Sequence, residues 1–143
     1  MRSLILCLLL ANRSFGAELD PAILTSVAPE NLKWSGKPGA YQQAIVYGEP
    51  SKPGVYIVLA KWPPGTGSRP HSHSTDRLVT VISGTWWVGT GDKYDVDTMV
   101  AMKAGSFIRH IADGIHYDQA KDEEVMVQIV GMGPVITKSA GAK

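Results

Sequence analysis

The sequence predicts an all-β protein in which short antiparallel strands form a sandwich or barrel. From residue 42 onward, runs of β-branched and aromatic residues recur at short intervals, and no amphipathic helical pattern separates them. The chain also contains 15 Gly and 9 Pro, scattered in a way that is typical of many strands joined by tight turns. A length of 143 residues with 44% hydrophobic content suits one domain with one buried core.

The first residues have the features of a secretory signal peptide. Arg2 supplies a short positive region, residues 4–11 form an unbroken apolar run, and small residues precede a cleavage site. We therefore predict a signal peptide over residues 1–16, with cleavage after Gly16 or, as the second choice, after Ala17. The alternative, a short buried N-terminal helix, has no amphipathic pattern to support it. The protein is accordingly expected to be periplasmic or secreted.

Removal of this leader would change the charge and the cysteine content. Loss of Arg2 and Arg13 takes the formal net charge from +1 to −1, and Cys7, the single cysteine, is lost with them. A net charge so close to zero does not indicate the basic surface that binds nucleic acid. The apolar run is shorter than the roughly 20 residues that a membrane span needs. We expect no nucleic-acid partner and no membrane span, and any bound metal must have nitrogen and oxygen ligands.

The segments on either side of the strand region are predicted to lie outside the barrel. Residues 17–41 form an N-terminal extension, in which Pro21 and Pro29 limit any helix to a turn or two because proline interrupts helical hydrogen bonding. Residues 134–143 are small and polar and are predicted to form a flexible tail. The barrel is therefore expected over residues 42–133.

At least seven strands are predicted within the barrel. They are placed at residues 44–47, 55–62, 77–82, 85–88, 97–102, 106–111 and 123–130. Gly and Asp residues mark the joints, and Ser83 with Gly84 predicts a hairpin turn between two of the strands. The acidic stretch at residues 118–124, which includes Asp118, predicts a turn and the exposed start of a strand.

The four histidines all fall within the strand region. His71 and His73 are two residues apart, so on a strand they share a face with Cα atoms about 6.6 Å apart. Two imidazoles at that spacing can converge on one cation, which needs metal–nitrogen bonds of about 2.0–2.1 Å. His116 opens another strand after a glycine turn and is the natural third ligand. The alternative is a pair of exposed loop histidines, and His110 is expected in a supporting or surface role.

Two groups of residues resemble sequence motifs of the cupin superfamily. The first motif reads G-x5-H-x-H-x3,4-E-x6-G, and the second reads G-x5-P-x-G-x2-H-x3-N. The residues in register with them are Gly65, His71, His73, Gly84, Gly105 and His116. In the second motif, Ile111, Asp113 and Ala120 replace the Pro, the second Gly and the Asn. The resemblance covers about residues 42–132 and implies an antiparallel double-sheet jelly-roll β-barrel, as in small single-domain bacterial cupins.

The main departure from the first motif is Arg77, which stands where the motif has Glu. Cupins usually place three histidines and that Glu around Fe, Mn, Zn, Ni or Cu. A guanidinium pointing the same way would repel a cation, so two outcomes stay open. Arg77 meets an anionic ligand beside a neutral three-His site, or the cation site is lost. Asp76 is one residue short of the Glu position and is expected to face away.

The signal peptide predicts export, and the resemblance implies a cupin that holds one divalent transition metal through His71, His73 and His116. A small organic acid or dicarbonyl compound is the expected ligand, with Arg77, Tyr117 and Gln128 as candidate contacts, and the chemistry would be that of an oxygenase, isomerase or hydrolase. No catalytic residue is identified. The alternatives are a non-catalytic small-ligand-binding protein and a metal-free structural cupin. A homodimer is expected from the family alone.

Overall fold

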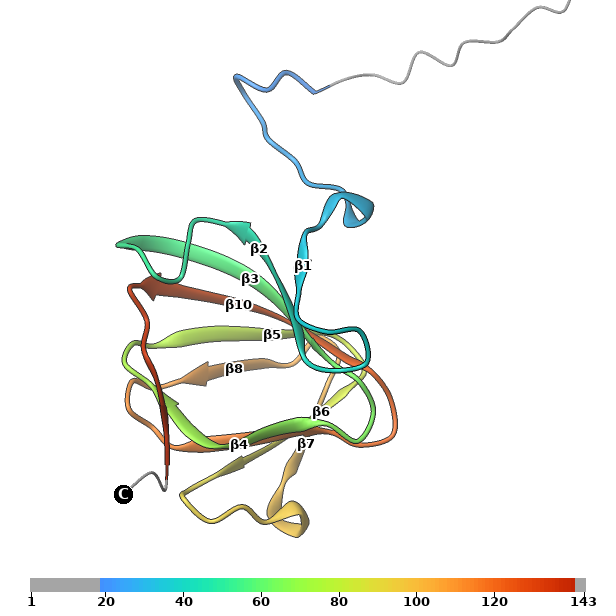
Figure 1. Cartoon of the computed structure of the whole chain (residues 1–143), viewed down its shortest axis with the longest axis vertical. Helices are drawn as coiled ribbons and strands as arrows, with labels where there is room; N and C mark the ends of the chain where they lie inside the picture. Colours follow the sequence, from blue (N-terminus) through green and yellow to red (C-terminus); the bar gives the residue numbers. More distant parts are fainter. Residues whose placement is uncertain (1–18, 141–143) are drawn as a thin grey trace, which may run out of the picture.

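The computed structural model describes residues 19–140 as two antiparallel β-sheets that face each other, as Figure 1 shows. The all-β, double-sheet architecture expected from the sequence is confirmed. The predicted signal peptide over residues 1–16 and its cleavage site lie outside the described residues.

Six strands form the first sheet and five form the second. The order in the first sheet is β1 (Trp34–Ser35), β2 (Gln42–Tyr47), β3 (Gly54–Trp62), β10 (Val125–Gly133), β5 (Arg77–Ser83) and β8 (Phe107–His110). The order in the second sheet is β11 (Thr137–Ser139), β4 (Gly67–His73), β9 (His116–Ala120), β6 (Thr85–Thr90) and β7 (Val100–Lys103). Two 3-10 helices, η1 (Pro29–Asn31) and η2 (Val96–Thr98), complete the described elements.

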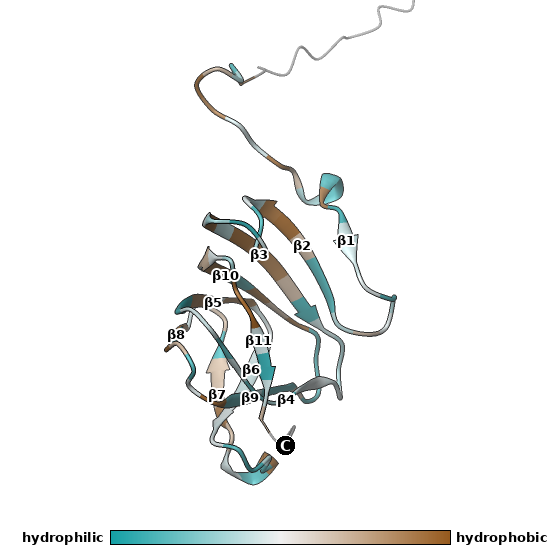
Figure 2. Ribbon diagram, turned by 60° about the vertical axis from the view of Figure 1, so that its left-hand side comes forward, coloured by the Kyte–Doolittle hydropathy of each residue, from teal (hydrophilic) through white to brown (hydrophobic). Residues whose placement is uncertain are grey.

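The core lies between the sheets, because alternate residues of each strand point inward. The inward residues of β3 are Tyr56, Val58, Ala60 and Trp62, and all four are buried. Trp86 reaches across from the opposite sheet, with its ring centroid 5.8 Å from that of Trp62. Burial of a large apolar side chain contributes about 1.5–3 kcal/mol, so this layer holds the two sheets together. Figure 2 shows the strongly hydrophobic stretches of β2 and β3.

The chain changes sheets at Gly84, where the sequence predicted a hairpin. Strand β5 ends at Ser83 and β6 begins directly after Gly84, but the two strands lie in different sheets and do not pair. Gly84 has a φ of +75°, and a Cβ atom at this position would collide with the carbonyl oxygen of Glu124. The chain passes so close to Glu124 at this point that only glycine fits. The hairpin predicted at Ser83 and Gly84 is therefore not formed.

The two ends of the described chain behave differently. The N-terminal segment leads away from the barrel in Figure 1 and contains the short helix η1, in keeping with the limit that Pro21 and Pro29 set. At the other end, where a flexible tail was predicted over residues 134–143, β11 forms and pairs with β4. The edge of β4 has unpaired backbone N–H and C=O groups, and residues 137–139 form hydrogen bonds with them. This pairing depends on the tertiary structure and cannot be read from the local composition.

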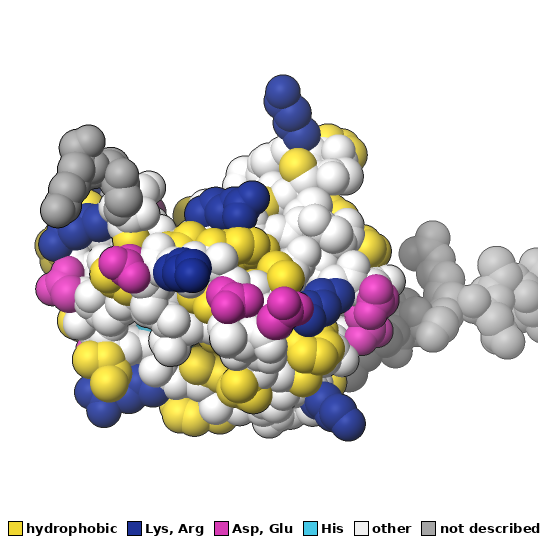
Figure 3. All heavy atoms as spheres, turned by 90° about the horizontal axis from the view of Figure 1, so that it is seen from below, with side chains coloured by type: hydrophobic (Ala, Val, Ile, Leu, Met, Phe, Trp, Pro, Cys, Tyr) yellow, Lys and Arg dark blue, Asp and Glu magenta, His cyan; other side chains and the backbone are white. Residues whose placement is uncertain are grey.

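The surface carries charges of both signs. In the view of Figure 3, Lys and Arg side chains alternate with Asp and Glu side chains among apolar ones. Within residues 19–140, no helix has the length and apolar character required to cross a membrane.

Candidate metal centre

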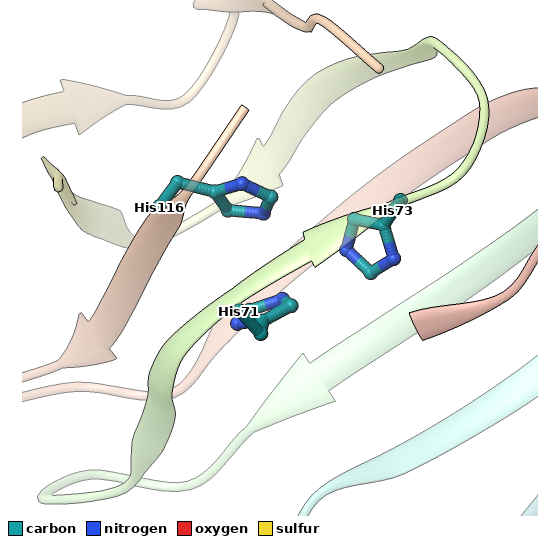
Figure 4. A group of neighbouring side chains, drawn as sticks. All are labelled: His71, His73 and His116. Carbon is teal, nitrogen blue, oxygen red and sulfur yellow. The ribbon is translucent and has the colours of Figure 1, made fainter. Parts of the chain in front are cut away.

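The three histidines predicted as ligands come together inside the barrel. His71 and His73 lie on β4, and the register of the sheet places His116 on β9 directly opposite His71. One ring nitrogen from each lies within 4.8 Å of the other two, and Figure 4 shows the three rings turned toward a common space. His71 and His73 thus share one face of β4, and the cross-strand pair adds His116. Together the three form a group that could hold a metal ion.

Backbone carbonyl groups fix the orientation of two of these rings. His71 Nδ1 lies 2.7 Å from the carbonyl oxygen of Arg69, and His116 Nδ1 lies 3.0 Å from that of Gly114. A carbonyl oxygen can only accept a hydrogen bond, so each Nδ1 carries the proton and each Nε2 keeps its lone pair. This is the arrangement that orients metal-ligating histidines.

A side chain from β11 fixes the third ring. His73 Nδ1 lies 3.0 Å from the hydroxyl oxygen of Thr137, which can accept the Nδ1 proton in the same way. The register pairs His73 with Thr137 across β4 and β11. The last strand of the described chain therefore completes the support of the centre.

The free nitrogens of the centre fit a cation. His73 Nε2 and His116 Nε2 are buried and have no hydrogen-bond partner within the described residues. A buried polar atom without a partner costs free energy, and a metal coordinated by these nitrogens would remove that cost. His71, His73 and His116 therefore suit a metal that prefers imidazole ligands.

The histidines are held in the neutral form that a metal requires. Burial, aided by the nearby charge of Arg77, lowers the pKa of His73 to about 3 and that of His116 to about 4. Burial likewise lowers the pKa of His71. Protons therefore compete weakly for these nitrogens near neutral pH.

His110 joins the cluster but differs from the three candidate ligands. It lies on β8 with 6% of its surface exposed, and its ring centroid is 3.8 Å from that of His116. Arg77 Nη2 lies 3.5 Å from His110 Nδ1. A guanidinium can only donate, so this Nδ1 accepts and the proton sits on Nε2. Burial lowers the pKa of His110 to about 2. His110 is thus a buried hydrogen-bond donor beside the centre, and its Nε2 has no lone pair to offer a metal.

Arg77 and the neighbouring Asp76 point to opposite sides of the first sheet. Asp76 accepts hydrogen bonds from Arg109 Nε, at 2.9 Å, and from the backbone N–H of Ala112, at 2.8 Å. Asp76 therefore faces away from the histidines, as expected. Arg77 faces the interior, where its Nε is buried without a partner and burial lowers its pKa.

A cavity of about 650 Å³ lies next to the histidine centre. Its charged and imidazole lining consists of Arg69, His71, His73, Arg77 and Asp118, whereas His110 and His116 are not among the residues that line it. The aromatic residues in its wall are Tyr41, Tyr56, Trp62 and Trp86. The combination of a charged group, imidazoles and aromatic rings is typical of small-molecule sites.

Asp118 is buried, although the sequence predicted an exposed acidic stretch. It lies on β9 two residues after His116, so both side chains point inward, and only 2% of its surface is exposed. It accepts a hydrogen bond from the backbone N–H of Ser68 at 3.2 Å, and burial raises its pKa to about 6. The spacing of two residues from a candidate ligand is the sequence signal that could have revealed it.

Tyr117 and Gln128 do not line this cavity. Tyr117 points to the opposite face of β9, where its hydroxyl lies 3.1 Å from Thr98 Oγ1. Gln128 lies on β10 between two buried, inward residues and therefore points to the outer side of the first sheet. The structure thus brings together Arg77 and the three histidines, and leaves these two candidate contacts outside the group.

Comparison with known proteins identifies the fold. No family model matches the sequence, and no curated protein matches it. Among solved structures, the chain is similar to RemF, a polyketide cyclase from Streptomyces resistomycificus, with a TM-score of 0.69 and 13% identity over 84% of this chain and 87% of that chain. It is also similar to a sugar phosphate isomerase from a cupin superfamily, from Silicibacter pomeroyi, with a TM-score of 0.63 and 15% identity over 82% of each chain. A third similar structure is an RmlC-like cupin from Shewanella frigidimarina, with a TM-score of 0.61 and 11% identity over 76% of this chain and 90% of that chain. The two-sheet barrel is therefore the cupin fold that the motifs implied.

Proposed function

We propose that this chain, which has the cupin fold, binds one divalent transition metal (Fe, Mn, Zn, Ni or Cu) through His71, His73 and His116. The observation that carries this proposal is the set of imidazoles whose Nδ1 atoms are held by protein oxygens, with two buried Nε2 atoms left unpartnered. Three neutral ligands would leave the full charge on the ion, which when bound supplies Lewis-acid or redox chemistry.

The cavity supports a small organic acid or dicarbonyl compound as the ligand. Arg77 contributes a positive charge to its lining, and within residues 19–140 no carboxylate lies at ion-pair distance from it. An anionic group of the ligand would provide the missing partner. The volume of about 650 Å³ falls within the range of small-molecule sites, and the aromatic wall suits a planar or cyclic skeleton.

Reaction with the ligand would be of the oxygenase, isomerase or hydrolase type. The similar solved structures include a polyketide cyclase and a sugar phosphate isomerase, so the fold supports several chemistries and does not decide between them. The alternatives are a non-catalytic small-ligand-binding protein and a metal-free structural cupin.

Metal analysis tests the proposal most directly. Purified protein should contain close to one equivalent of metal, or should take it up on reconstitution. His116→Asn should lose the metal because it removes a ligand. His110→Asn is the matched control and should retain it, since His110 Nε2 carries a proton. Less than about a tenth of an equivalent, with no gain on reconstitution, would exclude the three-His site and leave the structural alternative.

A substrate panel then separates an enzyme from a binding protein. Metal-loaded protein is assayed for oxygen consumption and product formation with dicarbonyl compounds and phenolic acids. Turnover that is lost in the His116→Asn variant supports an enzyme. Saturable binding without turnover supports the binding protein.

Export and dimer formation also belong to this proposal. N-terminal sequencing of the exported protein should show cleavage after Gly16 or Ala17, and an intact Met1 would contradict export by this leader. Homodimer formation is supported by exposed apolar residues on the outer side of the first sheet, among them Leu78 and Met132. Sedimentation analysis of the wild type and of a Leu78→Glu variant tests it, and a monomeric wild type would rule the dimer out.

A further inference from the structure

Several buried hydrogen-bond donors beside the histidine centre have no partner. Tyr56 Oη, Arg77 Nε and His110 Nε2 are buried and unpartnered within the described residues. They come from three strands of the first sheet, opposite the strands that carry the ligating histidines. A group of unpaired buried donors is costly, and an acceptor group of a ligand would remove that cost.

The sheet register places these three residues in one row. Tyr56 on β3 pairs with Gly131 on β10, Gly131 pairs with Arg77 on β5, and Arg77 pairs with His110 on β8. All three side chains therefore leave the same face of the sheet at the same height. The row ends at His110, whose ring contacts that of His116.

Gly131 leaves room for the tyrosine in this row. A Cβ atom at Gly131 would lie 2.5 Å from Tyr56 Oη, so the phenol ring lies over the glycine. Its hydroxyl is thereby directed across β10 toward β5, where Arg77 lies. The close packing of an aromatic ring over a cross-strand glycine fixes the hydroxyl in place.

The groups in this row can all donate hydrogen bonds. The guanidinium has no acceptor atom, and its hydrogen bond to His110 Nδ1 leaves the His110 proton on Nε2. The phenol of Tyr56 can donate its proton. The row therefore presents one positive charge and several N–H or O–H groups, which complement the oxygens of an anion.

We propose that Tyr56, Arg77 and His110 form a carboxylate-binding pocket next to the three-His centre. Arg77 supplies the single positive charge of this row, which matches a monoanion. Arg69 also lines the cavity, but its guanidinium is stacked over the Tyr94 ring at 4.2 Å. The buried carboxyl group of Asp118 in the same cavity disfavours a dianion such as phosphate. This assignment deepens the proposed function by naming the group that holds the acid end of the ligand. The pocket itself requires no metal.

Carboxylate binding by metal-free protein tests this pocket. Benzoate is titrated into chelator-treated protein by calorimetry, with the variants Arg77→Met and Tyr56→Phe. Each variant should lose about tenfold or more in benzoate affinity, because each removes a hydrogen bond to a charged group. Arg109→Met is the matched control, since Arg109 is exposed on the outer side of the same sheet, and its affinity should equal that of the wild type. Near-ultraviolet circular dichroism verifies that each variant is folded.

The outcomes separate the pocket from the metal centre. Absence of benzoate binding in the wild type, or equal affinities in Arg77→Met and Arg109→Met, would overturn the pocket. A preference for sulfate over benzoate would overturn the assignment to carboxylates. If the protein binds benzoate but never binds metal, the pocket stands and the three-His proposal fails.

The proton on His110 offers an independent test. Nitrogen-15 spectra of the imidazole groups should show the Nε2–H form for His110 and the Nδ1–H form for His71 and His116. The Nδ1–H form at His110 would contradict the donor role, because Arg77 could not then donate to Nδ1.

Discussion

At the scale of single residues, the hydrogen-bond partner of Nδ1 decides what each histidine can do. A carbonyl oxygen at His71 and His116 leaves Nε2 free as a ligand, whereas the guanidinium of Arg77 at His110 places a proton there. Four chemically identical side chains within one cluster thus divide into three candidate metal ligands and a hydrogen-bond donor. The difference between them is set by the atom that forms a hydrogen bond with Nδ1 of each ring.

Thr137 should affect metal affinity although it does not contact the metal. Thr137→Val removes the oxygen that holds His73 Nδ1, so we expect metal affinity to fall by about 10- to 100-fold. Competition with a chromophoric chelator measures the change. Thr137→Ser keeps the hydroxyl and should restore most of the affinity. If Thr137→Val binds metal as tightly as the wild type, the hydroxyl does not position His73.

Arg77→Glu should tighten metal binding and weaken anion binding. The substitution removes a buried positive charge and places a carboxylate where the cupin motif has its fourth ligand, so metal affinity should rise by about tenfold or more. Chelator competition and benzoate titration measure the two effects. Arg77→Met separates loss of repulsion from gain of a ligand and should show the smaller rise. Unchanged affinities in both assays would mean that Arg77 does not face the site.

Residue-scale features differ in how far they could be predicted. The grouping of the three candidate ligands followed from spacing and motif alone. Asp113, which replaces a motif glycine, has a φ of 59°, and aspartate tolerates this conformation better than most residues. His110 could not be assigned, because its burial depends on contacts between β8 and the rest of the barrel. The inward direction of Asp118 follows from its spacing of two residues from His116, but its burial depends on how β9 packs in the barrel.

At the scale of elements, the register across the first sheet aligns a glycine with an aromatic ring and a charged side chain. Gly131→Ala should destabilise the protein by about 1–3 kcal/mol, because the new methyl group would force the Tyr56 ring out of its place. Urea unfolding measures the change. The double variant Tyr56→Leu with Gly131→Ala should be less destabilised than the sum of the single changes. Strict additivity would show that the ring and the glycine are not coupled.

Element boundaries in the middle of the barrel were predictable, and the connections between elements were not. Alternating β-branched residues indicate β3 and β10 directly. Gly84 is a turn residue in any reading, but whether it joins paired strands or changes sheets depends on the position of Glu124. Likewise, β11 exists because β4 has a free edge, which no local pattern at residues 137–139 encodes.

At the scale of the whole molecule, acid should destabilise the metal-free protein. Burial lowers the pKa of His71, His73, His110 and His116 below the ordinary value, so from about pH 6.5 downward the unfolded chain binds protons that the native chain does not. The free energy of unfolding must therefore fall as the pH falls. Asp118 acts in the opposite direction, since its raised pKa keeps a proton on the native chain between about pH 6 and 4. Four histidines outweigh one carboxyl group.

Urea unfolding between about pH 7 and 5 measures this dependence. In that range His110→Asn should reduce the slope, by an amount that grows to about 1.4 kcal/mol per pH unit near pH 5, where the unfolded histidine is almost fully protonated. Gln128→Asn provides a control, since it changes no titratable group and Gln128 points to the outer side of the first sheet, and it should leave the slope unchanged. Stability that is constant over this range would contradict burial of neutral histidines.

The position of β11 gives the barrel a weak point. This strand has three residues, all exposed, and pairs only with β4, so its detachment breaks few contacts compared with opening the core. The same strand lines the cavity and holds His73 through Thr137. Local opening of this edge would therefore widen the cavity and, at the same time, release His73 from Thr137. Molecules bound in the cavity could then exchange through a small local fluctuation, while the rest of the barrel stays folded.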